Sequence, residues 1–204
     1  MGFYNDVLLP KLCHLAMRNR RLIPYRQRAI SLAEGRVLEI GVGSGLNLPF
    51  YGASVSEILA LEPARPLVAM AQRSTSASAV PVEFIEGSAE MIPIDDDSID
   101  TVVTTWTLCT IPRADVALAE MRRVLRRSGR LAFVEHGLAP DKRVRYWQDR
   151  LTPAWRCISG GCHLNRPIRD MIEGSGFRVD RLETGYMRGP KPMTFMYEGC
   201  ARPR

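Results

Sequence analysis

LEIGVGSGLNLPFY, residues 38–51, joins a short hydrophobic run to a glycine-rich loop. The run ends around an acid at Glu39, and glycines follow at every second position from Gly41 to Gly45. A loop of this kind directly after a strand is typical of sites where the backbone lies close to a nucleotide-like ligand. The carboxylate restricts the ligand, because a pyrophosphate ~5 Å away would be repelled where the effective dielectric is low.

Short apolar runs alternate with amphipathic segments on both sides of this loop. The runs of strand length are RVLEI, EILALE, VEFIEG, IDTVVTTW, RLAFVEH, FRVDRLET and PMTFMYEGC. Helix-like segments occupy 64–78, 114–127, 140–157 and 166–175, and Ser128-Gly129 is the expected end of the second. Buried strands alternating with helices predict an α/β fold, a parallel sheet covered on both faces. The last two runs are joined by GYMRGPK, which is too short for a crossover helix, so one strand is expected to run antiparallel.

Length, hydrophobicity and cysteine usage restrict the class of protein. The 204 residues, 46% of them hydrophobic, are enough for one well-buried domain. No run approaches the ~18 apolar residues that cross a bilayer, and the N-terminus lacks the basic and apolar regions of a secretory signal. Five cysteines without a C-x-x-C pair indicate reduced thiols. We therefore expect one soluble domain in the cytoplasm.

The net charge of +6 raises the question of a nucleic-acid partner. The basic residues are mostly arginines spread along the chain, and no nucleic-acid-reading signature accompanies them, so none is predicted. One basic cluster lies in a helical region, 3–31, that Pro10 and Pro24 divide: Lys11, Arg18, Arg20, Arg21, Arg26 and Arg28. Two interpretations stay open. Residues 1–34 form a helical lid with a solvated basic face, or this face contacts an anionic membrane peripherally, at the inner membrane surface.

Three kinds of ligand compete for the glycine loop. A Walker phosphate loop needs a lysine that is missing here, and the dinucleotide fingerprint needs a small residue where Leu46 stands. S-Adenosylmethionine carries an ammonium and a sulfonium and no phosphate, so the carboxylate of Glu39 favours it. The next strand ends at Glu62, where an acid can accept both ribose hydroxyls. The residues therefore predict a methyl donor as the cofactor.

Four motifs in order support this interpretation: VLEIGVGSGLNLPFY, LALEP, EGSAEMIPIDDDSIDTVVTTWTLCTI and EMRRVLRRSGRLAFVEH. Over residues 35–136 the chain resembles the class I S-adenosylmethionine-dependent methyltransferases, in the group that contains the ubiquinone-type C-methylating enzymes. The resemblance implies a Rossmann-like seven-stranded sheet of order 3-2-1-4-5-7-6, strand 7 antiparallel, within a domain spanning 35–204. It also implies cofactor contacts from Glu39, Gly41, Gly43, Gly45, Asn47, Glu62, Pro63, Gly87, Ser88, Ala89 and Thr105. Among them Glu39 and the glycines hold the methionine part, Glu62 the ribose, and Ser88 with Ala89 the adenine. Ser88 departs from the family pattern, because many relatives have an acid there.

A second, narrower resemblance extends to about residue 170. TLCTI, FVEH and the downstream Pro153-Ala154-Trp155, Gly161-Cys162 and Arg166 are similar to the methyltransferase-like thiol S-methyltransferases. This implies a small-molecule acceptor, a thiol or sulfide, which needs little help from a base because its thiolate is present near neutral pH. Two alternatives stay open: a phospholipid headgroup N-methyltransferase of the phosphatidylethanolamine type, and a non-catalytic S-adenosylmethionine-binding module.

The catalytic and acceptor-binding residues are less clearly indicated. His136 and Glu135 end the fifth predicted strand, where a histidine is either a base or substrate-orienting group or a structural residue. Cys109, after the fourth strand, either faces the methyl group or packs in the core. The residues expected to line a substrate pocket are Tyr4, Trp106, Trp147 and Trp155, with 138–166 as a helical insertion over the substrate. Cys157, Cys162 and His163 resemble half a zinc site without a second ligand pair, so no metal is predicted.

Overall fold

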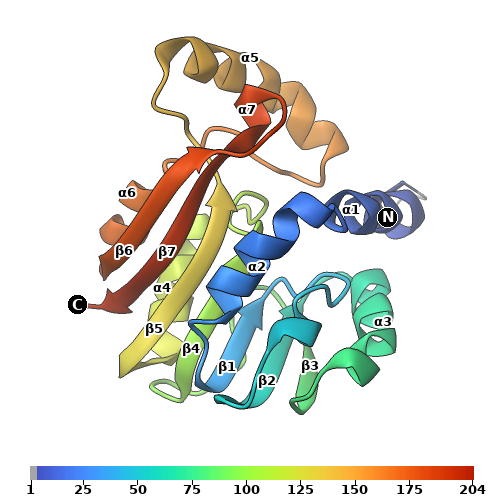
Figure 1. Cartoon of the computed structure of the whole chain (residues 1–204), viewed down its shortest axis with the longest axis vertical. Helices are drawn as coiled ribbons and strands as arrows, with labels where there is room; N and C mark the ends of the chain where they lie inside the picture. Colours follow the sequence, from blue (N-terminus) through green and yellow to red (C-terminus); the bar gives the residue numbers. More distant parts are fainter. Residues whose placement is uncertain (1–3) are drawn as a thin grey trace.

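The computed structural model describes residues 4–204, which form one seven-stranded sheet between two layers of helices (Figure 1). The strands are β1 (Gly35–Ile40), β2 (Val55–Glu62), β3 (Val82–Glu86), β4 (Ile99–Thr105), β5 (Leu125–His136), β6 (Phe177–Tyr186) and β7 (Phe195–Pro203). Their order is β3-β2-β1-β4-β5-β7-β6, and β7 pairs antiparallel with β5 and β6. The predicted sheet and its antiparallel strand are confirmed.

Each face of the sheet carries its own hydrophobic core. The helices are α1 (Leu9–Met17), α2 (Ile23–Ile30), α3 (Arg65–Arg73), α4 (Ala114–Val124), α5 (Lys142–Ile158), α6 (Ile168–Gly174) and α7 (Lys191–Thr194), with short turns of other helix types between them at Tyr4–Leu8, Arg20–Leu22, Leu48–Phe50 and Thr75–Ala77. The fully buried Leu118 and Met121 of α4 and Ile172 of α6 pack on one face. Ile30 at the end of α2 and Ala71 of α3 pack on the other. Burial of these apolar stripes holds the layers together.

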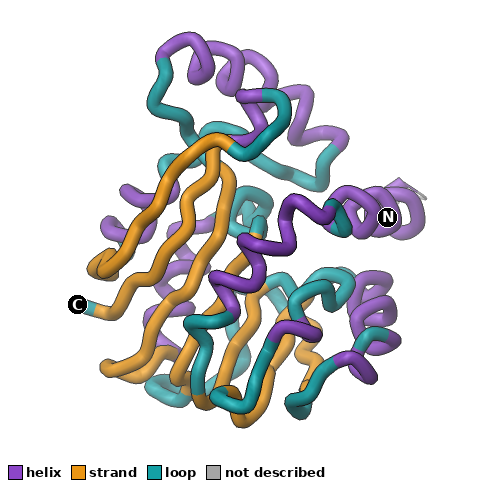
Figure 2. The backbone as a smooth tube through the Cα atoms, in the orientation of Figure 1, coloured by secondary structure: helices purple, strands orange, loops and turns teal. Residues whose placement is uncertain are grey.

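The parallel strands end together at one edge of the sheet, and this edge positions the site. β1 lies between β2 and β4, which is the point where the order of the parallel strands reverses. Ligands of open α/β sheets bind in the crevice outside the carboxyl ends of the strands at such a point. Figure 2 shows α1 and α5 beyond this edge of the sheet.

Two element boundaries differ from those expected. α4 ends at Val124 and not near Ser128-Gly129, because Leu125 is buried and already pairs with Ile99 of β4. A register shift in this pairing lets the strand continue past Gly129. Burial of Leu125 thus outweighs the helical pattern of the arginines around it.

The second difference lies in the last predicted strand, PMTFMYEGC. Its first three residues belong to the short helix α7, and β7 begins only at Phe195. Proline lacks the N–H that a ladder needs and suits the first turn of a helix, which is where Pro192 stands.

The N-terminal region is divided at its prolines as expected. Pro10 and Pro24 occupy the first turns of α1 and α2, where no intrahelical N–H partner is needed. Across residues 4–204, we find no helix that combines the length and the apolar character needed to cross a membrane.

Candidate active site

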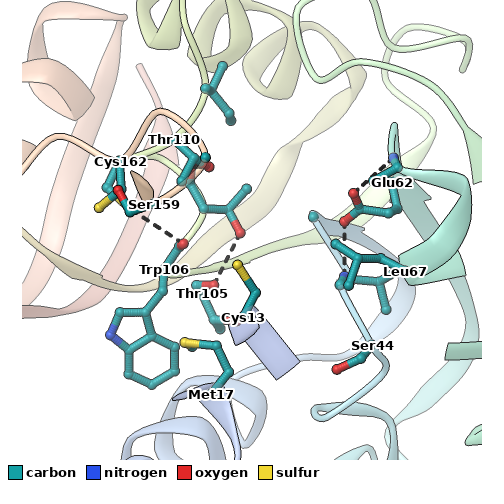
Figure 3. A pocket seen from close by; sticks show the side chains of 18 of the residues that line it. Cys13, Met17, Ser44, Glu62, Leu67, Thr105, Trp106, Thr110, Ser159 and Cys162 are labelled. Carbon is teal, nitrogen blue, oxygen red and sulfur yellow. Dashed lines mark hydrogen bonds between the residues drawn. The ribbon is translucent and has the colours of Figure 1, made fainter. Parts of the chain in front are cut away.

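A cavity of about 740 Å³ opens at the carboxyl ends of β1, β2, β4 and β5. Its walls come from the glycine loop, α1, the loop after β4 and the segment between α5 and α6. Figure 3 shows Glu62 and Trp106 on opposite sides, with Cys13 of α1 between them. Residues far apart in the chain therefore share one cavity.

The glycine loop brings bare backbone to the cavity wall. Gly41 and Gly43 have φ values of +67° and +57°, a left-handed conformation that glycine adopts without cost. A Cβ on Gly41 would lie 2.5 Å from Cγ2 of Thr107, so the close approach of the two loops requires glycine there. Gly45 does not line the cavity: a Cβ there would lie 3.1 Å from Cα of Ala71, so it serves the packing of the loop on α3.

Glu62 ends β2 and points its carboxylate into the cavity. It accepts hydrogen bonds from the backbone N–H groups of Gly43 and Ala64, both at 3.0 Å. Burial raises its pKa, and these two bonds counteract that rise. A carboxylate offers about four lone-pair directions, so acceptors remain for a diol. The residues present thus fit the ribose of S-adenosylmethionine.

Glu39 does not reach the cavity, contrary to the expectation that it lies beside the ligand. Its side chain is buried behind the wall and accepts hydrogen bonds from Asn47 Nδ2 and the Tyr51 hydroxyl, both at 2.8 Å. Asn47 lines the cavity and also donates to Thr105 Oγ1 at 3.0 Å. The carboxylate therefore acts on the cavity through Asn47.

Arg26 is the residue at this end of the cavity that the sequence interpretation missed. Its guanidinium is buried, donates to Asn47 Oδ1 at 2.6 Å and lies 4.9 Å from the ring centre of Trp106. Burial lowers its pKa to about 10, while the charge of Glu39 acts in the opposite direction. A carboxylate buried in a strand, as Glu39 is, needs a nearby positive charge. The basic cluster of the N-terminal region was the signal that could have identified Arg26.

The rest of the basic cluster divides into two groups. Arg28 forms a bidentate ion pair with Glu198 of β7, at 2.6 and 2.7 Å. The other group consists of Lys11, Arg18, Arg20 and Arg21, which are exposed, as Arg28 also is. The cluster is therefore not one continuous basic face, because two of its arginines serve the fold and the cavity.

We expect the buried carboxyl of Glu39 to make stability fall as pH rises. Burial raises its pKa from 4.5 to about 7, so between these values the folded chain holds a proton that the unfolded chain has lost. Relative to a Glu39→Gln variant, the wild type should lose roughly 3 kcal/mol of unfolding free energy between pH 4.5 and pH 7. Urea unfolding across this range measures the difference, and the exposed Glu83→Gln should follow the wild type. Parallel profiles for Glu39→Gln and the wild type would contradict the expectation.

The residues predicted to contact the adenine lie at the cavity wall beyond Glu62. Pro63, Gly87, Ser88 and Ala89 all line the cavity. The Ser88 hydroxyl accepts a hydrogen bond from the backbone N–H of Glu90 at 3.2 Å. Ser88, which stands where many relatives have an acid, therefore caps a local turn and places no charge in this part of the cavity.

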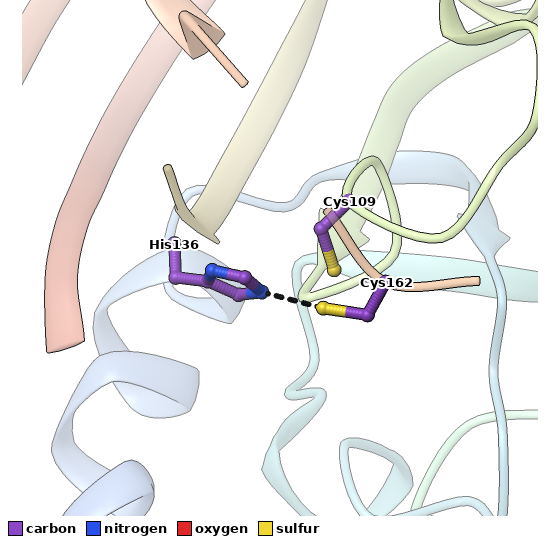
Figure 4. Close-up of side chains that lie close together, drawn as sticks. All are labelled: Cys109, His136 and Cys162. Carbon is purple, nitrogen blue, oxygen red and sulfur yellow. Dashed lines mark hydrogen bonds between the residues drawn. The ribbon is translucent and has the colours of Figure 1, made fainter. Parts of the chain in front are cut away.

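Three side chains meet at the opposite end of the cavity, as Figure 4 shows: Cys109, His136 and Cys162. His136 Nε2 lies 3.1 Å from Cys162 Sγ, and one ligand atom from each of the three lies within 4.8 Å of the others. The hydrogen bond with Cys109 and then that with His136 lower the pKa of Cys162, whereas the pKa of Cys109 is raised. Burial alone would lower the pKa of His136, but Cys162 reverses this effect. We refer to these residues as the Cys–His–Cys cluster.

Glu135 does not belong to this group, which corrects its prediction as a catalytic residue. It does not line the cavity, and its Oε1 accepts from Thr104 Oγ1, Thr107 N and Leu108 N at 2.9, 3.0 and 3.1 Å. Burial raises its pKa to about 7. Its position holds the loop after β4, in which Trp106 adopts a φ of +52°.

Arg166 braces the same loop from the other side. Its guanidinium donates to the carbonyl oxygens of Leu108 and of Ile111, the latter at 2.6 Å. Cys109, His136, Trp155, Cys162 and Arg166 are the residues that carry the narrower resemblance. The structure brings all of them to one end of the cavity or into direct support of it.

Two of the four predicted pocket aromatics lie elsewhere. Trp106 and Trp155 line the cavity, but Tyr4 and Trp147 do not. Tyr4 donates its hydroxyl proton to the carbonyl oxygen of Ile158 and so joins the N-terminal turn to the end of α5. Trp147 is 47% exposed and packs edge-on against its neighbour Tyr146. Both tryptophans belong to α5, with Pro153 between them, and only the one near the end of the helix reaches the cavity.

A sheet of this order, a glycine loop after β1 and an acid at the end of β2 that faces the cavity are the features of a class I S-adenosylmethionine-dependent methyltransferase. Known proteins agree. A family model described as a methyltransferase domain matches residues 38–133. The thiol S-methyltransferase TMT1B of Homo sapiens is 30% identical over 200 residues, covering 95% of this chain and 80% of the human protein. The chain belongs to the family of S-adenosylmethionine-dependent methyltransferases, and its cofactor is S-adenosylmethionine.

One further relative and one solved structure are also similar to this chain. Phosphatidylethanolamine N-methyltransferase of Cereibacter sphaeroides is 32% identical over 123 residues, which cover 58% of this chain and 60% of that protein. A crystal structure of a SAM-dependent methyltransferase from Aquifex aeolicus superimposes with a TM-score of 0.66 at 18% identity, covering 96% of this chain and 98% of that chain. Sequence identity this low shows a shared fold, and the acceptor is a separate question.

Proposed function

We propose that this enzyme transfers the methyl group of S-adenosylmethionine to the sulfur of a small thiol or of hydrosulfide. The observation that carries the proposal is the convergence of Cys109, His136 and Cys162 at one end of the cavity. These residues belong to the segments that resemble thiol S-methyltransferases. The similarity to the human thiol S-methyltransferase supports the same acceptor class.

In this proposal the cofactor lies along the strand ends. Glu62 accepts the ribose hydroxyls, and Ser88 with Ala89 borders the adenine. The bare backbone at Gly41 and Gly43 admits the methionine part, whose carboxylate is drawn to Arg26, while Asn47 and Thr105 hold its amino end. S-Adenosylmethionine supplies an electrophilic methyl group on a positively charged sulfur. The chain then has to orient an acceptor in line with that bond and exclude water, which accounts for much of such a rate acceleration.

The acceptor end of the cavity suits a thiol because no carboxylate from residues 4–204 lines it, and its histidine, His136, already contacts Cys162 Sγ at 3.1 Å. Among the described residues that line the cavity, Glu62 is the one carboxylate, and it lies at the opposite end, where it faces the cofactor in this proposal. Trp106 and Trp155 give the acceptor end an apolar character. A hydroxyl acceptor would need a base to remove its proton, whereas a thiol ionises near neutral pH and is intrinsically nucleophilic.

One observation favours a second candidate, methylation of a phospholipid headgroup. Helix α1 lines the cavity and exposes Leu12 and Leu15 to solvent, at 46% and 70%, near the exposed basic residues of the cluster. An apolar stripe beside basic side chains suits a helix that lies on an anionic membrane. In that case the enzyme would work at the membrane surface, as a phosphatidylethanolamine enzyme must.

A turnover assay separates the two candidates. S-Adenosylhomocysteine release should be saturable with hydrosulfide or a small alkyl thiol and absent with phosphatidylethanolamine vesicles. Neutralising Arg18, Arg20 and Arg21 to glutamine should leave thiol turnover unchanged, as should neutralising Lys142, Arg143 and Arg150 on α5. Turnover on vesicles alone, lost in the first triple variant and kept in the second, would overturn the thiol acceptor and establish the lipid one.

A further inference from the structure

The Cys–His–Cys cluster has the composition and geometry of an incomplete tetrahedral metal site. Its three donor atoms lie within 4.8 Å of one another, and all three side chains are buried. Around Zn²⁺, sulfur ligands stand at about 2.3 Å and imidazole nitrogen at about 2.0–2.1 Å, so ligand atoms are about 3.5–3.8 Å apart. The separation of 3.1 Å between His136 Nε2 and Cys162 Sγ is a few tenths of an ångström short of that spacing. Small side-chain rotations would therefore complete the geometry.

The main chain holds the two cysteines against each other. The backbone N–H of His163, next to Cys162, donates to the carbonyl oxygen of Cys109 at 2.8 Å. The loop that carries Cys162 turns through Gly161, where a Cβ would lie 3.4 Å from the carbonyl oxygen of Thr110. Arg166 and Glu135 fix the loop of Cys109 from either side. Preorganised donors on a braced scaffold are what a metal site requires.

We propose that Cys109, His136 and Cys162 bind one Zn²⁺ ion, and that the open fourth position faces the cavity and takes the sulfur of the acceptor. Two thiolates and an imidazole are ligands that zinc prefers, and three protein ligands with an open position are typical of catalytic zinc. Each of the three residues lines the cavity, so the remaining position is accessible to a small molecule there. The role assigned to the fourth ligand rests on the proposed thiol acceptor, whereas metal binding by the three residues does not.

Methyl transfer at this site balances in atoms and electrons. Binding to the ion favours the thiolate, and the thiol proton leaves to solvent. A sulfur lone pair then forms the new S–CH₃ bond while the bond between the methyl carbon and the sulfonium breaks, which leaves a neutral thioether in S-adenosylhomocysteine. The indole N–H of Trp155 is buried, lines the same cavity and helps to lower the pKa of the neighbouring Cys162 thiol. It is placed to donate to an anionic sulfur.

Cobalt substitution tests the site without relying on activity. The full-length protein is reduced, freed of metal with a chelator under anaerobic conditions and titrated with Co²⁺. We expect one equivalent to bind with the intense visible bands of tetrahedral cobalt and a thiolate-to-cobalt charge-transfer band. Cys109→Ser and Cys162→Ser should weaken binding by more than the roughly 10–100-fold that loss of an outer-shell partner costs. The exposed Cys157→Ser on α5 is the matched control and should bind as the wild type does.

X-ray absorption of the wild-type protein loaded with zinc gives a second readout that does not depend on variants folding. A first shell of two sulfurs and one nitrogen plus one further ligand is expected, and addition of ethanethiol should exchange that ligand for a third sulfur. Absence of stoichiometric metal binding by the fully reduced protein would overturn the proposal. If a protein that binds no metal still methylates thiols, the metal site is wrong and the proposed thiol acceptor stands. If the protein binds the metal but ethanethiol does not replace the fourth ligand, the proposed thiol acceptor is wrong and the metal site stands.

Discussion

Replacing Glu62 by glutamine is expected to weaken the binding of S-adenosylmethionine by about 10–100-fold. The reason is the position of its carboxylate, which ends β2, faces the cavity and is oriented by the N–H groups of Gly43 and Ala64. Hydrogen bonds to a charged group contribute about 1.5–3 kcal/mol, and each 1.4 kcal/mol is tenfold in affinity. Glutamine keeps one acceptor oxygen but turns an amide donor toward a backbone donor.

The matched control is Glu86→Gln, one strand away. Glu86 is paired with Glu62 in the register of β2 and β3, but its side chain is exposed and forms an ion pair with Arg65. Isothermal titration with S-adenosylmethionine, or with S-adenosylhomocysteine, should show loss of affinity in the first variant alone. Equal affinities in both variants would remove Glu62 from the ribose site. Thermal unfolding in parallel shows whether the loss arises from the binding site or from the fold.

Replacing Glu135 by alanine is expected to lower the free energy of unfolding by about 3 kcal/mol. The alanine leaves the backbone N–H groups of Thr107 and Leu108 buried without the carboxylate that accepts from both. Each unsatisfied buried donor costs about 1–3 kcal/mol, and removal of a buried carboxylate with a raised pKa recovers part of that cost. Glu135→Gln keeps an acceptor oxygen at the same place, so its loss should be about 1 kcal/mol.

Urea unfolding measures this difference, and hydrogen exchange locates it. In Glu135→Ala the amides of Thr107 and Leu108 should lose protection, while those in the centre of β4, such as Val102, should keep it. Since Cys109 belongs to the same loop, metal binding should weaken in the alanine variant and less so in the glutamine variant. Unchanged protection at Thr107 would show that the carboxylate does not hold the loop.

Local sequence patterns predicted most of the fold. Each buried strand is marked by a run of β-branched and aliphatic residues, and the short connection before Phe195 indicated one antiparallel strand. The order of the strands was implied by the resemblance to class I methyltransferases, and the structure has that order. The helix boundary at Val124 was wrong because burial of Leu125 depends on its partner Ile99, which lies in a distant strand. Helix propensity depends on the arginines beside Leu125 and contains no information about Ile99.

The prediction of the cofactor-binding residues rests on a similar reason. The glycine loop and Glu62 lie directly after β1 and at the end of β2, and parallel strands bring their carboxyl ends together. Glu39 and Gly45 were assigned to the ligand because a sequence motif does not show which of its residues lie behind the cavity wall. Their burial is decided by Tyr51, Asn47 and Ala71, each of which is reached only after the chain has folded.

The sequence alone determined the class of the protein, because the strands and the cofactor loop are encoded in runs of neighbouring residues. Only the tertiary structure brought the Cys–His–Cys cluster together. Cys109, His136 and Cys162 come from a loop after β4, the end of β5 and a loop after α5, and no spacing along the chain relates them. Arg26 likewise enters the cavity from the N-terminal helices. Such groups meet because packing of separate elements sets their distances, and that information is absent from any single segment.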